Sequence, residues 1–215
     1  MVDMIGVLDL QGGVFEHLDH LSRIGIEGRS VKEPSKIQGL SGLIIPGGES
    51  SCLARLMHIF GVAEAIIHEH EKGMKIWGTC AGAILLAKVV VGENPHLSLI
   101  DIEIERNSFG SQLESFSAKA SIPLIAEEPL PLTFIRAPKI RRVGPGVDVL
   151  LKMEDYIAAA ESPTVLVTIF HPELTDSLAF HQHFARKCGL SLPGVVPHRD
   201  STWHTKSWTR YRRTP

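Results

Sequence analysis

The sequence predicts an α/β fold: a single doubly wound domain with a mostly parallel central sheet, flanking helices and an inserted antiparallel β section. Three observations support this prediction. Short apolar runs typical of buried strands alternate with amphipathic stretches of helical period over the first part of the chain. In the middle of the chain, apolar and polar residues alternate with period two, as in half-exposed antiparallel strands. The continuous apolar run 165–170 then returns the chain to the central sheet.

Strands and helices alternate in the prediction for the first part of the chain. Apolar residues recur at helical spacing at Val14, Leu18, Leu21 and Ile24, so we expect a helix over residues 14–24. The other elements expected here are strands at 5–10, 28–31, 42–46 and 74–77 and helices at 50–60, 62–70 and 80–90.

Shorter strands are expected from residue 99 onward. Residues 99–105 (LIDIEIE) alternate between apolar and polar side chains, and parts of 112–122 do so as well. The remaining elements expected are strands at 132–135, 147–151, 156–160 and 165–170 and a closing helix at 177–188.

Composition excludes several classes of protein. Hydrophobic residues make up 44% and charged residues 21% of the 215 residues, which is ordinary for a globular chain. The net charge of −2 gives no electrostatic case for binding nucleic acid or a membrane, and no apolar run approaches the roughly 20 residues that span a bilayer. The three scattered cysteines form neither a disulfide framework nor a zinc motif, and the acidic N-terminus is a poor signal peptide. We therefore expect a cytoplasmic protein.

The last residues differ in composition from the rest. Residues 195–215 contain five basic side chains and one acidic side chain, together with two of the three tryptophans, and show no helical or strand period. We expect a domain over residues 1–190 and a basic and aromatic tail, 191–215, that is poorly ordered or docked on a neighbour. This composition also suits RNA, but a solvated extension is the simpler interpretation, and we expect no nucleic-acid partner.

The sharpest local signal is the pentapeptide GTCAG, which follows a predicted strand and opens a predicted helix. A nucleophile at such a turn is held out of the sheet, and flanking glycines avoid a steric clash. The positive end of the helix dipole and its free N–H groups favour a thiolate. Cys80 is therefore a candidate nucleophile. The alternative is an inert, buried cysteine at the end of a strand.

A base, and a group that orients the base, are expected near a thiol nucleophile. His171 and Glu173 follow the apolar run 165–170, at the carboxyl end of a predicted central strand, where open α/β sheets bind ligands. In an extended segment, residues two apart share one side. Glu173 can then hold one ring nitrogen of His171 while the other nitrogen faces Cys80. The alternative is a surface histidine and glutamate in a loop.

A third motif, PGGES, lies between a predicted strand and a predicted helix. Its glycines, Gly47 and Gly48, allow the backbone to turn N–H groups toward a ligand, as an oxyanion hole requires, and the N–H of Ala81 is a candidate second donor. Glu49 is a candidate ligand for a substrate ammonium group. The alternative is a simple glycine turn with Ser50 as the helix cap.

Together these motifs resemble those of the triad-type class I glutamine amidotransferases, which split glutamine through a γ-glutamyl thioester and pass the ammonia to a synthase. Over about residues 4–190 the sequence is similar to the glutaminase subunits of pyridoxal 5′-phosphate synthase, the PdxT/SNO family. ERNSFG and FIRAP narrow the resemblance to this family. The strings that carry it are IGVLDLQGG (5–13), LIIPGGESS (43–51), WGTCAGAILLAK (77–88), NPHLSLIDIEIERNSFGSQ (94–112), FIRAPKI (134–140) and FHPEL (170–174).

The resemblance implies a role for each motif. It implies that Cys80, His171 and Glu173 form a catalytic triad, and that Gln11 lies near the oxyanion hole and the interface with the synthase. The residues that it implies for binding glutamine are Gly47, Gly48, Glu49, Arg106, Ile135 and Arg136.

The resemblance further implies a heteromeric complex. The partner is a synthase subunit of the PdxS/SNZ type, which combines ribose 5-phosphate and glyceraldehyde 3-phosphate with the ammonia released from L-glutamine, in the biosynthesis of pyridoxal 5′-phosphate (vitamin B6). That product forms on the partner, and this chain has no P-loop or GxGxxG motif, so we expect no cofactor on it. Two alternatives stay open: a glutaminase that serves another synthase, and a catalytically silent binding subunit.

Two further features of the sequence lie outside these motifs. The family commonly has a basic residue after RNSFG, where this chain has Ser111; the change affects a surface or interface contact and leaves the triad untouched. His181 and His183 lie in the predicted closing helix. Because residues two apart do not share a helix face, we expect no metal site there.

Overall fold

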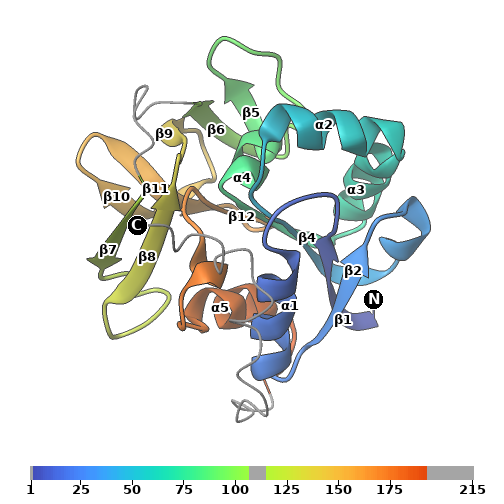
Figure 1. The fold of residues 1–215 in the computed structure, drawn as a ribbon, viewed down its shortest axis with the longest axis horizontal. Coiled ribbons are helices and arrows are strands. Elements are labelled where there is room, and N and C mark those ends of the chain that lie inside the picture. The colour runs from blue at the N-terminus through green and yellow to red at the C-terminus, as the bar shows by residue number, and fades with distance from the viewer. Residues whose placement is uncertain (1, 107–114, 193–215) are drawn as a thin grey trace, which may run out of the picture.

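Helices cover both faces of a central β-sheet in the computed structural model, which describes residues 2–106 and 115–192 (Figure 1). The strands are β1 (Val2–Leu8), β2 (Glu27–Val31), β3 (Leu40–Ile45), β4 (Lys75–Thr79), β5 (Ala87–Val90), β6 (Ile100–Glu105), β7 (Ser115–Ala120), β8 (Leu130–Ile135), β9 (Lys139–Val143), β10 (Asp148–Met153), β11 (Tyr156–Glu161) and β12 (Val165–Thr168). The helices are α1 (Val14–Arg23), α2 (Ser50–Ile59), α3 (Val62–Glu71), α4 (Ala81–Leu86) and α5 (Ala179–Lys187), with short 3₁₀ helices η1 (Pro34–Lys36) and η2 (Pro172–Leu174). The ten-stranded sheet has the order β2-β1-β3-β4-β12-β11-β9-β6-β5, and β10 pairs with β11.

The strands β2, β1, β3, β4 and β12 form the parallel half of this sheet. Every residue of β3 and β12 is buried, as expected for parallel strands with helices on both faces. In Figure 1, α1 and α5 lie on one side of these strands and α2 and α3 on the other. Parallel strands end at the same edge of a sheet, so the loops after β1, β3, β4 and β12 meet there.

The antiparallel section predicted for the middle of the chain continues the same sheet. β11 pairs antiparallel with β12, β10 and β9, and β9 pairs antiparallel with β6. β7 and β8 form a separate two-stranded sheet. The predicted fold class is confirmed: the chain is an α/β domain whose parallel strands carry an antiparallel β section.

The prediction of one helix over residues 80–90 is wrong in its second half. α4 ends at Leu86, and Ala87 is already extended, with a ψ of 140°. Residues 87–90 form β5, which pairs in parallel with β6. Two of these residues are β-branched valines, which fit a pleated strand better than a helix. No sequence pattern predicts β9, because Ile140 is the one fully buried residue among its five.

Several sequence predictions lie in parts of the chain that the structure does not describe. The tail 191–215 is described at its first two residues alone, and Ser111 falls between the two described ranges. The division into a domain and a tail therefore stays a prediction. Among the described residues no single helix is long and apolar enough to cross a membrane; α2 and α3 meet that criterion when counted together, across a bend of 88°.

α4 packs against the sheet through glycines. A Cβ on Gly82 would collide with the carbonyl oxygen of Ile45 in β3, and a Cβ on Gly78 would lie 2.5 Å from the carbonyl carbon of Gly82. Because neither neighbour is a flexible side chain, both positions require glycine. This close approach sets the turn between β4 and α4 at the edge of the sheet.

We predict that Gly82→Ala lowers the free energy of unfolding by about 2 kcal/mol, because a clash with the backbone of Ile45 belongs at the upper end of the usual overpacking cost of about 1–3 kcal/mol. The higher helix propensity of alanine returns at most about 1 kcal/mol. The measurement is the midpoint of urea unfolding. Gly28→Ala is the matched control, since its nearest neighbours would be the side chains of Leu18 and Leu21, which can move. Equal stability of Gly82→Ala and wild type would contradict the packing argument.

Candidate active site

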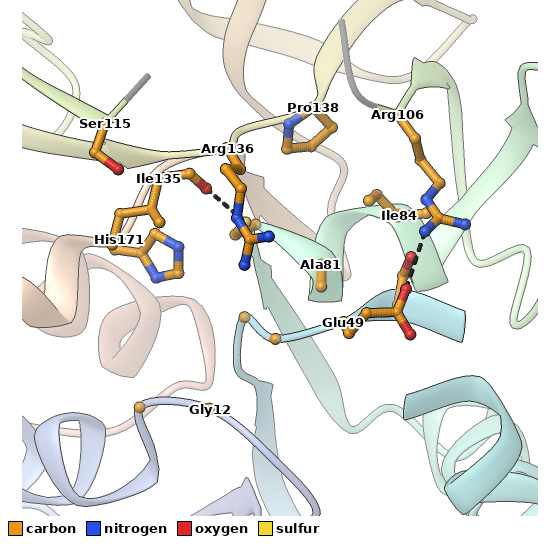
Figure 2. A pocket seen from close by; sticks show the side chains of 15 residues that line it. Gly12, Glu49, Ala81, Ile84, Arg106, Ser115, Ile135, Arg136, Pro138 and His171 are labelled. Carbon is orange, nitrogen blue, oxygen red and sulfur yellow. Dashed lines mark hydrogen bonds and ion pairs between the residues drawn. The ribbon is translucent and has the colours of Figure 1, made fainter. Parts of the chain in front are cut away.

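A cavity of about 720 Å³ opens at the carboxyl edge of the parallel strands, within the size range of small-molecule sites. Its wall comes from the loops after β1, β3, β4, β8 and β12 and from the end of β6. Figure 2 shows Arg106 and Glu49 on one side of the cavity and His171 and Arg136 on the other. All the residues predicted to bind glutamine line this cavity, whereas Gln11 and Glu173 are not among its lining residues.

Cys80 lies on the tight turn between β4 and α4. Its φ of 49° and ψ of −106° are rare for residues other than glycine, and such strain costs about 1–3 kcal/mol. Its N–H donates to the carbonyl oxygen of Thr168 in β12 at 2.8 Å, and its Sγ lies 3.9 Å from the carbonyl oxygen of Ile135. The side chain is thereby held at the cavity. Ala81, the first residue of α4, also lines the cavity, and its role as an oxyanion donor stays a prediction.

His171 follows β12, and its ring lies between Cys80 and Glu173. Nδ1 of His171 donates to Oε1 of Glu173 at 2.8 Å, and the backbone N–H of His171 donates to Thr133 in β8 at 2.8 Å. Burial opposes protonation of the ring, but the Glu173 carboxylate and a hydrogen bond with the Cys80 side chain outweigh it and raise the pKa of His171 to about 10. Burial also opposes ionisation of Glu173, yet the facing histidines, His17 and His171, lower its pKa.

The loop after β3 is packed against the loop after β1. The backbone N–H of Glu49 donates to Oε1 of Gln11 at 2.8 Å. Gly48 has a φ of 148°, and a Cβ there would lie 2.6 Å from the same oxygen, while a Cβ on Gly12 would collide with the carbonyl oxygen of Gly47. Contacts between the two loops therefore require these glycines. Gln11 lies against the candidate oxyanion loop, and the donor role of Gly48 stays a prediction.

Glu49 and Arg106 form an ion pair at one side of the cavity (Figure 2). Nη2 of Arg106 donates to Glu49 at 3.0 Å, and Nη1 donates to both carboxylate oxygens of Glu93 at 2.6 and 2.7 Å. The Glu49 carboxylate also accepts the backbone N–H of Cys52, which lowers its pKa. Glu49, rather than Ser50, is therefore the N-cap of α2. Sequence reasoning did not find Glu93, because it lies in a turn after β5 that no motif marks.

Comparisons with known proteins identify the family. The model of the SNO glutamine amidotransferase family matches residues 7–190. The chain belongs to this family. A protein named pyridoxal 5′-phosphate synthase subunit PdxT from Syntrophus aciditrophicus is 58% identical over 208 residues, which cover 96% of this chain and 93% of the relative. A protein of the same name from Caldanaerobacter subterraneus subsp. tengcongensis is 47% identical over 184 residues, covering 85% of this chain and 97% of the relative.

Solved structures agree with the family assignment. A crystal structure described as a glutamine amidotransferase has a TM-score of 0.81 and 40% identity, and the match covers 86% of this chain and 99% of that chain. PurLQS from Thermotoga maritima has a TM-score of 0.64 at 18% identity, covering 88% of this chain and 96% of that chain. This second likeness concerns the fold alone. The resemblance inferred from the sequence motifs is therefore confirmed at the level of the family.

Three histidines lie buried behind Glu173 in this member of the family. His17 and His20 come from α1 and His181 comes from α5, and each is at most 1% exposed. Burial lowers the pKa of His17 to about 4 and that of His20 to about 3, and it also lowers the pKa of His181, so all three are neutral at pH 7. His183 lies on another face of α5, with its Nε2 2.9 Å from Oε2 of Glu161. The sequence analysis separated His181 from His183 correctly but did not predict that His181 meets histidines of α1.

We predict that the protein loses stability as the pH falls from about 6.5 to 5. The buried histidines have folded-state pKa values below 6.5, so in this window the unfolded chain binds more protons than the folded one. Burial is the main cause at all three rings. Arg23 adds repulsion at His20 and His181, and the Glu173 carboxylate opposes the effect of burial at His17 and His20. His171 opposes this loss only slightly, because it is protonated in the folded state throughout the window while the unfolded ring changes from half to almost fully protonated.

The measurement is the urea midpoint as a function of pH. His20→Leu should flatten this pH dependence, because it removes one buried group that must stay neutral. The control is His58→Gln, which replaces an exposed histidine and should leave the slope unchanged. A His20→Leu slope as steep as that of the wild type would count against the prediction.

Proposed function

We propose that this chain is the glutaminase subunit of a pyridoxal 5′-phosphate synthase. It hydrolyses L-glutamine to L-glutamate and ammonia through a thioester on Cys80 and passes the ammonia to a synthase partner of the PdxS/SNZ type. The observation that carries the proposal is the ring of His171, which is hydrogen-bonded to the buried Glu173 and lies with Cys80, on its strained turn, beside Gly47 of the candidate oxyanion loop. The names of the relatives, pyridoxal 5′-phosphate synthase subunits, support the choice of partner.

The charges around the cavity fit a free α-amino acid. The guanidinium of Arg106 or Arg136 can bind the α-carboxylate, and Glu49 can bind the α-ammonium. Glu49 and Arg106 lie across the cavity from His171 (Figure 2), so a glutamine bound by this pair extends its side-chain amide toward Cys80. The carbonyl of Ile135 lies beside the sulfur, where it can accept a hydrogen bond from the amide nitrogen.

The side chains of the triad then perform an acyl transfer. Sγ of Cys80 attacks the amide carbon, and the N–H groups of Gly48 and Ala81 stabilise the oxyanion that forms. His171 gives its proton to the amide nitrogen, the C–N bond breaks, ammonia leaves and a γ-glutamyl thioester remains. A water molecule then gives a proton to His171 and attacks the thioester, which releases glutamate and restores the thiolate. Glu173 holds the ring in place and stabilises its charge.

We predict that Cys80→Ala abolishes glutamine hydrolysis. The activity of His171→Asn should fall nearly to the same level, because base and nucleophile act as a unit. Glu173→Gln should lose less activity, because Glu173 acts through His171. Steady-state glutamate release is the measurement. Wild-type activity of His171→Asn would exclude the triad.

Labelling tests the same assignment independently. A diazo or chloroketone analogue of glutamine should label Cys80 and spare Cys52 and Cys188, as read by peptide mapping. Cys52 is exposed, so its escape would show recognition of glutamine rather than lack of access; burial raises the pKa of the Cys188 thiol to about 12. Iodoacetamide is the control reagent and should label Cys52. Finding the analogue attached to Cys52 and not to Cys80 would refute the assignment of Cys80 as the nucleophile.

We predict that the synthase partner raises glutamine turnover by at least roughly tenfold, equivalent to about 1.4 kcal/mol of barrier. An oxyanion hole works when its N–H groups already point at the developing charge, and the Gly47–Gly48 peptide is conformationally permissive. Gln11 contacts this loop through Glu49, so a partner that docks on the first loop can fix the orientation of the peptide. Such control prevents ammonia from being released to water.

Glutamate release by the purified chain, with and without the synthase, tests this control. A free chain that works at the rate of the complex would contradict it even if the triad is correct. Activation by a different synthase alone would favour the alternative of a glutaminase for another pathway, and a lack of hydrolysis under every condition would favour a silent binding subunit. The cytoplasmic location expected from the sequence belongs to the same proposal.

A further inference from the structure

The buried side of Glu173 leads into a chain of three histidines. Oε2 of Glu173 lies 3.5 Å from Nε2 of His17. Nδ1 of His17 lies 2.9 Å from Nε2 of His181, and Nδ1 of His181 lies 3.1 Å from Nδ1 of His20. The contacts cross from α1 to α5, which lie next to each other (Figure 1). Each ring thus joins the next in a line that ends at the carboxylate.

The surroundings keep this line of histidines dry and uncharged. The indole of Trp77 in β4 packs edge-on against His17 and His181, with ring centroids 5.5 and 4.9 Å apart. Burial holds the pKa values of the three imidazoles far below neutrality. Each ring therefore carries one N–H donor and one bare nitrogen acceptor.

The number of protons in the chain equals the number of contacts along it. Three neutral rings supply three protons. Three contacts can use one: those of Glu173 with His17, of His17 with His181, and of His181 with His20. All three contacts hold a proton only when every proton points toward Glu173.

The charge of Glu173 favours this direction. A carboxylate only accepts, and hydrogen bonds to a charged acceptor are roughly twice as strong as those to a neutral carbonyl. A bare Nε2 of His17 facing Oε2 would place lone pairs against each other in a buried site. The protons therefore lie on Nε2 of His17, Nε2 of His181 and Nδ1 of His20, all directed toward Glu173. Nε2 of His17, Oε2 of Glu173 and Nε2 of His20 form no hydrogen bond of standard geometry in the part of the chain that the structure describes, so this direction rests on the charge of Glu173 across the 3.5 Å contact.

We propose that His17, supported by His181 and His20, is a positioning residue for Glu173: the aligned hydrogen bonds hold Oε2, so that Oε1 stays directed at His171. The proposal rests on the proposed triad, because it concerns the group that orients the base. The 3.5 Å contact is long for a hydrogen bond, as catalytic hydrogen bonds often are before substrate binds. Aligned hydrogen bonds also polarise and strengthen one another.

The direction of the hydrogen bonds can be tested on the wild-type chain. Long-range ¹H–¹⁵N correlation spectra of protein labelled with ¹⁵N-histidine distinguish the two neutral tautomers of each ring. We expect the Nε2–H tautomer for His17 and His181 and the Nδ1–H tautomer for His20. An Nδ1–H tautomer at His17, or an Nε2–H tautomer at His20, overturns the proposal, and this readout does not depend on whether any variant folds.

The positioning role is tested by kinetics of the complex with the synthase. His17→Leu should lower kcat for glutamine hydrolysis by roughly tenfold or more and change KM by less than about twofold, because Glu49 and Arg106 lie at the other side of the cavity. His17→Gln retains an N–H near the place of Nε2 and should recover most of kcat. Leu21→Ala is the control for destabilisation, since Leu21 lies on the buried side of α1 toward Gly28; it should lower the unfolding temperature and spare kcat.

Two kinetic outcomes would overturn the positioning role. One is a kcat of His17→Leu within about twofold of wild type, and the other is a His17→Gln enzyme as slow as His17→Leu. Cys80→Ala and His171→Asn are measured alongside. If they are also active, the triad itself is wrong; if they are inactive while His17→Leu is normal, the positioning role alone fails.

Discussion

The strained backbone of Cys80 is the constraint on which the rest of the site depends. Its positive φ persists because its N–H is bound by Thr168 in β12 and because Gly78 and Gly82 let β4, α4 and β3 approach within backbone contact. A strain of about 1–3 kcal/mol is small beside the burial of the parallel strands on both faces. The sheet thereby fixes the sulfur beside the ring of His171, and the loops after the neighbouring strands complete the cavity around it.

The chemistry at the cavity also depends on the dry interior behind it. A buried carboxylate without partners would be protonated, but Glu173 is ionised because histidines face both of its oxygens. The two neighbours differ in charge. His171 is held protonated between two acidic groups, whereas burial keeps His17 neutral. The positive charge next to Glu173 therefore lies on the ring that must transfer a proton, and not on the ring behind it.

Sequence patterns predicted the parts of the fold and site that are marked by a local change in polarity or by glycines. Continuous apolar runs located the buried parallel strands, and the glycines around Cys80 located the turn that holds it. The patterns failed where tertiary contacts decide: Val89 belongs to β5 because β6 lies beside it, and Glu93 reaches the site from a turn without a motif. They also failed at His17 and His20, which lie on the buried face of α1 but count as polar, so the apolar period of that helix does not reveal them.

Under the proposed function, the ion pair between Glu49 and Arg106 bears on what the site selects. A zwitterionic amino acid offers one carboxylate and one ammonium, so its two ion pairs replace one that already exists. A carboxylate alone would compete at Arg106 with Glu49 and Glu93, both of which hold the guanidinium at 3.0 Å or less. The substrate carboxylate binds Arg106 more favourably when an ammonium on the same molecule binds Glu49. The Glu49 carboxylate, displaced from Arg106, is then paired with that ammonium, and no charge is left without a partner. The two charges of the substrate are therefore recognised together, and a molecule that satisfies both has its side chain directed toward Cys80.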